Sequence, residues 1–273
     1  MKEGDYIVIE RIVEMYACIE HEYQETIENI GGSSETIYTY SYTTGWTQNP
    51  QKAATFKGEN SEKPEDIPSN YDNWIDKMPK STASQVSGFT INGVNVKGNL
   101  TFYGAKDLAL STNDVRNLGS NEYVAHNVIY RANNGSPNDI KVGDVRIRYR
   151  VIMASDNGLL IAKYSHNQFE PFLTKKAASI FHFFAGVHTK NEAVKILNEE
   201  YQQTLWLFRL TGFLMMFCGL MLITNPVTTL MSVIPLFAKI GHFAYGIIAF
   251  LTSLIITGLT ILISIFFNNI YLK

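Results

Sequence analysis

The sequence has few cysteines, no surplus of positive charge and, in its last quarter, no acidic residue at all. Of the two cysteines among 273 residues, Cys18 lies in a strand-like segment and Cys218 in an apolar one, which excludes a disulfide framework and a cysteine metal site. The 23 basic and 25 acidic residues give a net charge of −2, which disfavours nucleic-acid binding through bulk charge. Residues 204–273 contain no Asp or Glu and only three cations. The chain therefore divides into a mildly acidic, water-soluble part and an apolar tail suited to lipid.

Sequence signatures of catalysis are also missing. The chain has no G-x-S-x-G, H-E-x-x-H, P-loop or G-x-G-x-x-G motif. His182 and His188 lie six residues apart, a poor spacing for two ligands on one helix or strand face, and His21, His126 and His166 are scattered over other segments. These histidines are more typical of structural positions than of a site. We therefore predict a protein that is not an enzyme and that holds no cofactor and no metal.

Two apolar runs in the tail are long enough to cross a membrane. The second, 243–267, is 25 residues without a charged side chain, about 37 Å as a helix against a hydrocarbon core of roughly 30 Å. The first, 204–224, begins with Trp206 and Arg209, which suit a membrane interface. The segment 226–240 between them is interrupted by proline and predicts an interfacial piece. The alternative, a helical hairpin buried in a soluble protein, is less favourable because a domain of this size can hardly bury both runs.

Small and hydroxyl side chains recur along the second run. Such residues let helices approach closely in lipid and form hydrogen bonds across the contact, which predicts helix packing and self-association through this face. The alternative is that the hydroxyls bond back to their own helix. The predicted helix-packing face consists of Gly246, Thr252, Ser253, Thr257 and Thr260.

The soluble part, 1–188, predicts an α+β fold that is rich in antiparallel hairpins. Segment 6–23 has strand character, and 36–43 alternates strictly between tyrosines and mostly small hydroxyl residues, which indicates a first hairpin. The tyrosine row could stack on bases or sugars, but packing in a half-buried strand is the better interpretation. Residues 47–84 predict a loop-rich insert, and an amphipathic helix over 189–203 connects the domain to the first span.

One strand carries three arginines. Segment 145–151 alternates Arg146, Arg148 and Arg150 with apolar side chains, and Asp156-Asn157-Gly158 predicts a turn into a second hairpin with 159–164. The arginine face could bind an anion, a lipid headgroup or a partner protein. The plainer interpretation is a solvated strand face that pairs with the acidic surplus.

Several segments follow one another in an order typical of one family. They are Val13-Glu14-Met15-Tyr16, then Tyr38-x-Tyr40-x-Tyr42 with Trp46, Gly143-Asp144-Val145-Arg146, Pro171-Phe172-x-Thr174-Lys175, and Thr204-Leu205-Trp206-Leu207-x-Arg209 leading into Gly212-Phe213-x-Met215-Met216-Phe217-x-Gly219-Leu220. In this succession, which covers nearly the whole chain, the sequence resembles the LUMA family of multispanning membrane proteins of animals and bacteria. It differs in beginning at the first strand, without the family's N-terminal span, and in ending about where the last span would start.

The resemblance implies a large domain held between membrane spans. In eukaryotes the family is found in the endoplasmic reticulum and inner nuclear membrane, where it is associated with lamins and emerin and is thought to organise membrane-protein complexes. No enzymatic activity is established for it. The resemblance thus implies an integral membrane protein of those membranes if the chain is eukaryotic, or of the cell membrane if it is bacterial.

Together these observations predict a membrane-anchored scaffold. Its partners would be membrane lipid, other membrane or envelope proteins and a second copy of itself, with no nucleic acid. One alternative is a membrane-surface enzyme, which a deep pocket gathering His126, His166 or His182 with carboxylates would favour. The other is an oligomeric channel or transporter subunit, which two spans with few polar groups argue against.

Overall fold

The structure is a computed structural model that describes residues 4–28, 33–58, 67–136, 138–174, 179–231 and 235–271, without the side chains of residues 28, 224–231, 235–245 and 267–271. It is β-rich and mainly antiparallel in its first two thirds, with two parallel strand pairs, and it ends in two apolar helices, which confirms the predicted α+β class. The chain forms two compact units. One comprises Met1–Tyr23 and Thr39–Ala193, and the other comprises Gln24–Tyr38 and Val194–Lys273.

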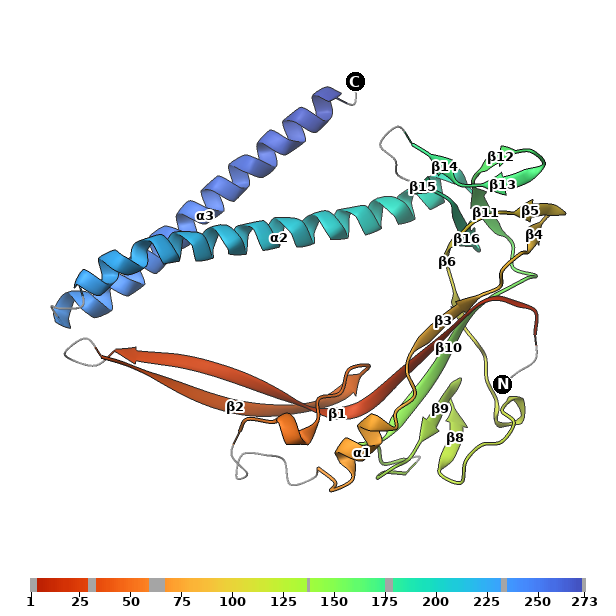
Figure 1. The fold of residues 1–273 in the computed structure, drawn as a ribbon, viewed down its shortest axis with the longest axis horizontal. Helices are drawn as coiled ribbons and strands as arrows, with labels where there is room; N and C mark the ends of the chain where they lie inside the picture. The colour runs from red at the N-terminus through yellow and green to blue at the C-terminus, as the bar shows by residue number, and fades with distance from the viewer. Residues whose placement is uncertain are drawn as a thin grey trace. The chain divides into compact units, whose positions relative to one another are not determined.

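The largest sheet has seven strands, in the order β2-β1-β10-β9-β8, with β3 added to β1 and β7 to β10. Figure 1 shows β1 and β2 as a long hairpin, which confirms the first predicted hairpin. The strands are β1 (Tyr6–Glu28), β2 (Ser34–Thr47), β3 (Thr82–Gln85), β7 (Lys106–Asp107), β8 (Glu122–Ala125), β9 (Val128–Arg131) and β10 (Val145–Met153).

Over the described residues, three smaller sheets complete the soluble part, with strand orders β11-β16-β6, β12-β13-β5-β4 and β14-β15. Their strands are β4 (Thr90–Ile91), β5 (Val94–Val96), β6 (Thr101–Tyr103), β11 (Gly158–Ile161), β12 (Lys163–Ser165), β13 (Gln168–Glu170), β14 (Phe172–Leu173), β15 (Ser179–Ile180) and β16 (His182–Ala185).

The predicted second hairpin is wrong. β10 pairs with β1 along one edge, from Val145 to Met153, and with β9 and then β7 along the other. Both edges of β10 are therefore filled, and β11 pairs with β16 instead of folding back on β10. The chain turns at Ala154 and Ser155, just before Asp156-Asn157-Gly158, but long-range pairing with the N-terminal strand takes the place of the local partner.

Two hydrophobic cores hold the soluble part together. The first covers one face of the seven-stranded sheet, where alternate residues of β1 and β10 are buried, among them Val13, Met15, Val145 and Ile147. The second lies against Val8 and Ile152 and is built mainly from β6 and β16 and the residues before them. Burial of a Val, Ile or Phe side chain contributes about 1.5–3 kcal/mol, so these two clusters supply most of the driving force of the domain.

Three tight hairpins have two-residue turns whose central residues have positive φ, as type I′ turns require. His126-Asn127 joins β8 to β9, His166-Asn167 joins β12 to β13, and Asn92-Gly93 joins β4 to β5. Asn and Gly tolerate this conformation best, which explains their positions here.

The predicted insert 47–84 is largely irregular over its described residues. It contains the 3₁₀ helix η1 (Ala53–Thr55) and the short helix α1 (Tyr71–Asp76), and its end forms most of β3. A second 3₁₀ helix, η2 (Thr112–Asp114), lies between β7 and β8.

Tyr71 of helix α1 is fully buried, and its hydroxyl accepts a hydrogen bond from the backbone N–H of Cys18 at 3.3 Å. Burial raises the pKa of Tyr71 to about 12.

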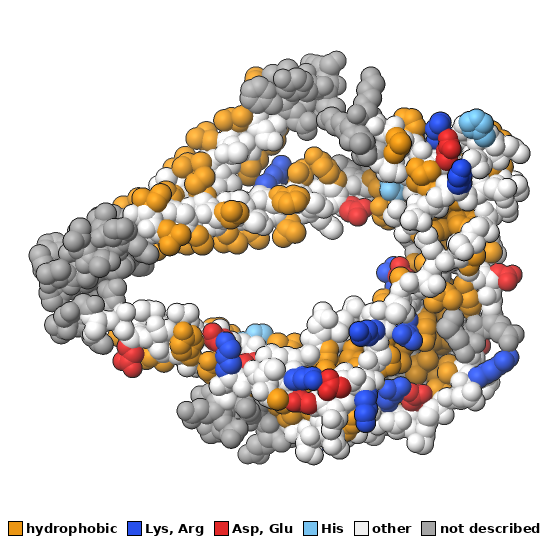
Figure 2. Space-filling view, in the orientation of Figure 1, with side chains coloured by type: hydrophobic (Ala, Val, Ile, Leu, Met, Phe, Trp, Pro, Cys, Tyr) orange, Lys and Arg blue, Asp and Glu red, His pale blue; other side chains and the backbone are white. Residues whose placement is uncertain are grey.

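Two long helices form the C-terminal part, α2 (Lys190–Met231) and α3 (Pro235–Tyr271). The predicted connecting helix 189–203 is the first part of α2, and it continues into the first apolar run without a break. By length and composition, Lys190–Ile223 and Gly246–Phe266 each contain a stretch long and apolar enough to cross a membrane. Figure 2 shows hydrophobic side chains along the described parts of both helices, with few charged ones.

The predicted interfacial segment 226–240 is not a separate element over its described residues. Its first part continues α2 through Pro226 to Met231, and its last part begins α3 at Pro235, while residues 232–234 lie outside the described residues. A proline removes one intrahelical hydrogen bond and does not by itself end a helix in apolar surroundings. The position of this segment at a membrane surface stays a prediction.

Candidate interaction face of the seven-stranded sheet

The side of the seven-stranded sheet opposite the first core carries the predicted arginine face. Along β1 and β10, Val8 lies opposite Ile152 and is buried beneath the second core. The following pairs on this face are polar or half-exposed. They are Glu10 with Arg150, Ile12 with Arg148, and Glu14 with Arg146. The alternation predicted for 145–151 is thus observed, with Val145, Ile147 and Val151 buried and the three arginines on the other face.

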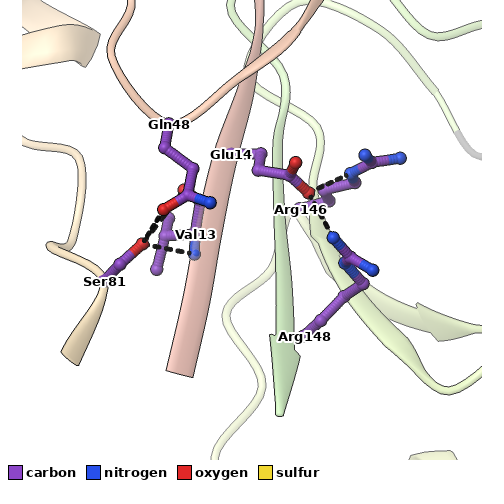
Figure 3. Close-up of polar contacts among 6 residues, drawn as sticks. All are labelled: Val13, Glu14, Gln48, Ser81, Arg146 and Arg148. Carbon is purple, nitrogen blue, oxygen red and sulfur yellow. Dashed lines mark hydrogen bonds and ion pairs between the residues drawn. The ribbon is translucent and has the colours of Figure 1, made fainter. Parts of the chain in front are cut away.

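Carboxylates of β1 pair with the arginines. Arg146 Nε lies 2.7 Å from Glu14 Oε2, and Arg148 Nη2 lies 3.2 Å from the same oxygen (Figure 3). Arg150 Nη1 lies 3.5 Å from Glu10 Oε2, and its Nη2 donates to the carbonyl of Ala105 at 2.8 Å. The preferred interpretation, in which the arginines pair with acidic residues, is therefore confirmed. Use of the same face for an anion or a partner stays a prediction.

The neighbouring arginines favour the charged form of the Glu14 carboxyl. Its side chain is only 12 % exposed, and burial alone would raise the pKa of its carboxyl. The hydrogen bond from Arg146 and the positive charges of Arg146 and Arg148 outweigh burial and lower the pKa of Glu14 below its ordinary value. Three arginines face two glutamates, so the face keeps a small positive excess.

Aromatic rings continue the face beyond the charged pairs. The guanidinium of Arg146 lies 4.4 Å from the centre of the Trp46 ring, a cation–π contact. Trp46 in turn packs edge-on against Tyr16 and Tyr130, and Tyr130 stacks on Tyr123 with 5.3 Å between ring centres. Glu122 and Arg131, which also form an ion pair of 2.8 Å, alternate with Tyr123 and Tyr130 and therefore lie on the opposite face of the sheet. Arginine and aromatic side chains are the residue types enriched at protein–protein interfaces.

A groove lies where β3 and β2 meet end to end along β1, and two of its lining residues, Ile75 and Met78, pack against the first core. The hydroxyl of Ser81 accepts a hydrogen bond from the backbone N–H of Val13 at 3.0 Å and donates to Gln48 Oε1 at 3.2 Å, so the two side chains bridge the gap between the strands (Figure 3). The groove has a volume of about 580 Å³ and is open to solvent. It is lined by Gln48, Asn49, Pro50, Ile75, Asp76, Met78, Pro79, Lys80 and Ser81.

The histidines do not gather. His126 and His166 are exposed turn residues of different sheets, and His182 lies on β16 against the rings of Tyr103 and Phe184. His21 contacts Thr43 Oγ1 at 2.8 Å. Within the described residues, no group of three or more His, Cys, Asp or Glu side chains could hold a metal ion.

The tyrosine row of β2 is used partly for packing. Tyr42 packs against Phe56 with 5.5 Å between ring centres, and its hydroxyl donates to Glu20 at 2.7 Å. Tyr38 is 51 % exposed. The half-buried interpretation therefore holds for Tyr42 but not for Tyr38.

The residues of the predicted helix-packing face have different environments. Ser253 is fully buried with Ala249 one turn before it, and beside them Phe250 packs against Phe213 and Phe217 of α2. A β-carbon at Gly246 would meet no atom within 4 Å. Thr252 and Thr257 are half-buried, and Thr260 is exposed.

Two hydroxyls of this face form hydrogen bonds with carbonyl groups of their own helix. Ser253 donates to the carbonyl of Ala249 at 2.7 Å, and Thr260 donates to that of Ile256 at 2.8 Å. The alternative interpretation therefore holds for these two residues. Packing of the face against a second copy stays a prediction.

Sequence reasoning missed the acidic half of the arginine face. Glu10, Ile12, Glu14 and Tyr16 share one face of β1 by simple alternation, in the same spacing as the arginines of β10. Matching the acidic residues of β1 to the arginines of β10 could have predicted that these two strands pair.

The fold and the helices define the class, an integral membrane protein with a β-rich soluble domain and two apolar helices. The family described as Transmembrane protein 43 matches residues 15–269. The chain belongs to this family, which is the LUMA family that its motifs resemble. No curated protein and no solved structure gives a significant match to the chain.

Proposed function

We propose that this protein is a membrane-anchored scaffold of the LUMA type, which organises a complex of membrane proteins and catalyses no reaction. The two apolar helices hold it in the bilayer, and the soluble domain presents sheet surfaces to partner proteins. Its compartment would be the endoplasmic reticulum and inner nuclear membrane in a eukaryote, or the cell membrane in a bacterium. Its partners would be other membrane or envelope proteins.

The observation that supports this proposal is the open face formed by Trp46, Tyr130 and the arginines of β10. Each arginine is oriented by a neighbouring strand, so little side-chain entropy is lost when a partner contacts it. The face consists of ion pairs and aromatic rings on one side of a sheet, whereas a catalytic site needs a concave pocket with convergent polar groups. A protein partner with an acidic and apolar surface suits it best.

The test is purification of the tagged full-length protein from its own membranes after mild crosslinking. We expect partner proteins in near-stoichiometric amounts, and we expect Arg150→Ala to reduce them, since this arginine is the most exposed of the three at 42 %. Lys195→Ala is the matched control because Lys195 is a cation of α2, not of the sheet, and is 77 % exposed. Recovery of the protein alone, or an equal loss of partners with both variants, would contradict the proposal.

A further inference from the structure

The far part of the β1–β2 hairpin, defined as residues 24–28 and 33–38 and called the distal arm, has no second layer over its described residues. The side chains of 24–27 and 33–38 are all exposed. Ile27, Ile37 and Tyr38 keep 41 %, 41 % and 51 % of their surface in contact with solvent. A two-stranded ribbon is marginally stable in water unless a third strand or another layer covers it. The distal arm therefore has the properties of a surface that another chain completes.

The outer edge of β2 is open along the distal arm. β2 is the terminal strand of the seven-stranded sheet, with β1 as its neighbour. Of the described residues, none outside β1 forms a backbone hydrogen bond with residues 34–38. Natural edge strands are protected from pairing by proline, lysine, a bulge or short length. Residues 34–38 contain no proline and no lysine, and β2 is 14 residues long.

The charge of the arm has one sign. Residues 12–51 contain six glutamates and no Lys, Arg or Asp, and three of the six, Glu25, Glu28 and Glu35, lie in the distal arm. For Glu25 and Glu35, no ion pair is found within the described part of the chain. The arm therefore presents a negative field next to an open strand edge and exposed apolar side chains.

We propose that the outer edge of β2 along residues 34–38 accepts an extended basic segment of a partner protein as an additional strand. Backbone hydrogen bonds would give the affinity, and lysine or arginine side chains opposite Glu35 and its neighbours would give the selectivity. A second copy is disfavoured because pairing two arms brings their carboxylates together, and a negatively charged lipid surface is disfavoured for the same reason. This inference rests on the proposed scaffold function and names the chemistry of one partner.

The direct test uses the full-length protein in lipid nanodiscs and a synthetic peptide of nine alternating lysines and valines. A peptide with glutamate in place of lysine is the matched control. We expect the lysine peptide to slow amide hydrogen exchange within residues 33–40, and we expect the effect to weaken as salt rises. No protection by the lysine peptide, or equal protection by the glutamate peptide, would overturn the proposal.

Two charge-reversal variants test whether the peptide binds at the outer edge of β2. Glu35→Lys should weaken binding of the lysine peptide by about tenfold, the equivalent of one charge-assisted contact. Glu199→Lys, which reverses an exposed carboxylate on α2, should leave binding unchanged. Equal effects of the two substitutions would show a general charge effect and would contradict a site on β2.

Proline at adjacent positions separates the outer edge from the inner one. Neighbouring N–H groups of a strand point to opposite sides. One of Thr36→Pro and Ile37→Pro should therefore abolish peptide binding with the hairpin intact, and the other should destabilise the hairpin itself. Retention of binding in both variants, or crosslinking of the arm to a second copy in place of the peptide, would overturn the proposal. The scaffold function is tested separately, by recovery of partners from membranes with these same variants.

Discussion

The indole ring of Trp74 occupies the space that a β-carbon at position 143 would need. Gly143, which has no β-carbon, lets the ring pack there. Gly143 also has φ of +101°, in the region that favours glycine. It lies at the turn before β10, where its N–H donates to the carbonyl of Tyr16 at 2.8 Å and continues the β1 ladder. One glycine thus joins helix α1 to the start of the central strand.

Gly143→Ala should destabilise the soluble domain by about 3 kcal/mol, because backbone strain adds to the clash with Trp74. The measurement is thermal or urea unfolding of the full-length protein in detergent, followed by circular dichroism. Gly88→Ala is the control, since Gly88 has φ of +74° and open space around it. That variant should lose only about 1 kcal/mol through strain. Equal losses would mean that Trp74 does not pack as described.

Glu14→Gln should make the protein less stable at neutral pH by about 1–2 kcal/mol, a figure reduced because its arginine partners are partly exposed. The pKa of Glu14 in the folded protein lies below its unfolded value of about 4.3. Its contribution to stability is therefore fully present above that pH and is lost as the pH falls through the folded pKa. Unfolding curves measured from pH 7 down to acid should converge for wild type and variant. A constant difference across this range would contradict the ion pair.

Asp144→Asn should cost about 2–3 kcal/mol, because the buried carboxylate accepts three backbone N–H groups. Its Oδ1 receives those of Asn134 and Gly135 at 2.9 and 3.0 Å, and its Oδ2 receives that of Lys141 at 2.9 Å. The side-chain amide of asparagine would place its own N–H group against one of these backbone N–H groups, so that hydrogen bond would be lost. Asp139→Asn, at a position 64 % exposed, should change stability by less than about 0.5 kcal/mol. Similar unfolding midpoints for both variants would disprove the role of Asp144.

The sequence allowed prediction of features that depend on local pattern. Strict alternation in 36–43 and 145–151 identified the strands and their faces, and the length of the apolar runs identified the helices. The partner of β10 could not be found in this way, because the pairing with β1 joins residues 130 or more positions apart, such as Glu14 and Arg146. A turn signal such as Asp156-Asn157-Gly158 is local, whereas the choice of partner strand depends on the whole sheet.

Only the local part of the candidate face, the arginines of one strand, could be predicted from the sequence. The arginines of β10 were recognisable as a stripe, but Trp46 became part of the face only because β2 and β10 both lie in the sheet that β1 joins. The small residues of α3 were also recognisable, yet their spacing does not show which of them contacts α2. Ser253 and Ala249 are buried beside Phe250, which packs on α2, whereas Gly246 faces open space.

The packing of α2 on α3 can be tested by a disulfide between positions 213 and 250, whose rings lie 5.6 Å apart. The double variant Phe213→Cys and Phe250→Cys, with Cys218→Ser to remove the native thiol of this region, should crosslink within one chain when membranes are oxidised. Ser253→Phe should abolish this crosslink, because a large ring cannot replace a fully buried serine, whereas Ser253→Ala should preserve it. The readout is the mobility of the reduced and oxidised chain in a denaturing gel. A crosslink between two chains instead of within one would show that the small face of α3 packs against another copy, and equal crosslinking in both Ser253 variants would contradict the packing described for α2 and α3.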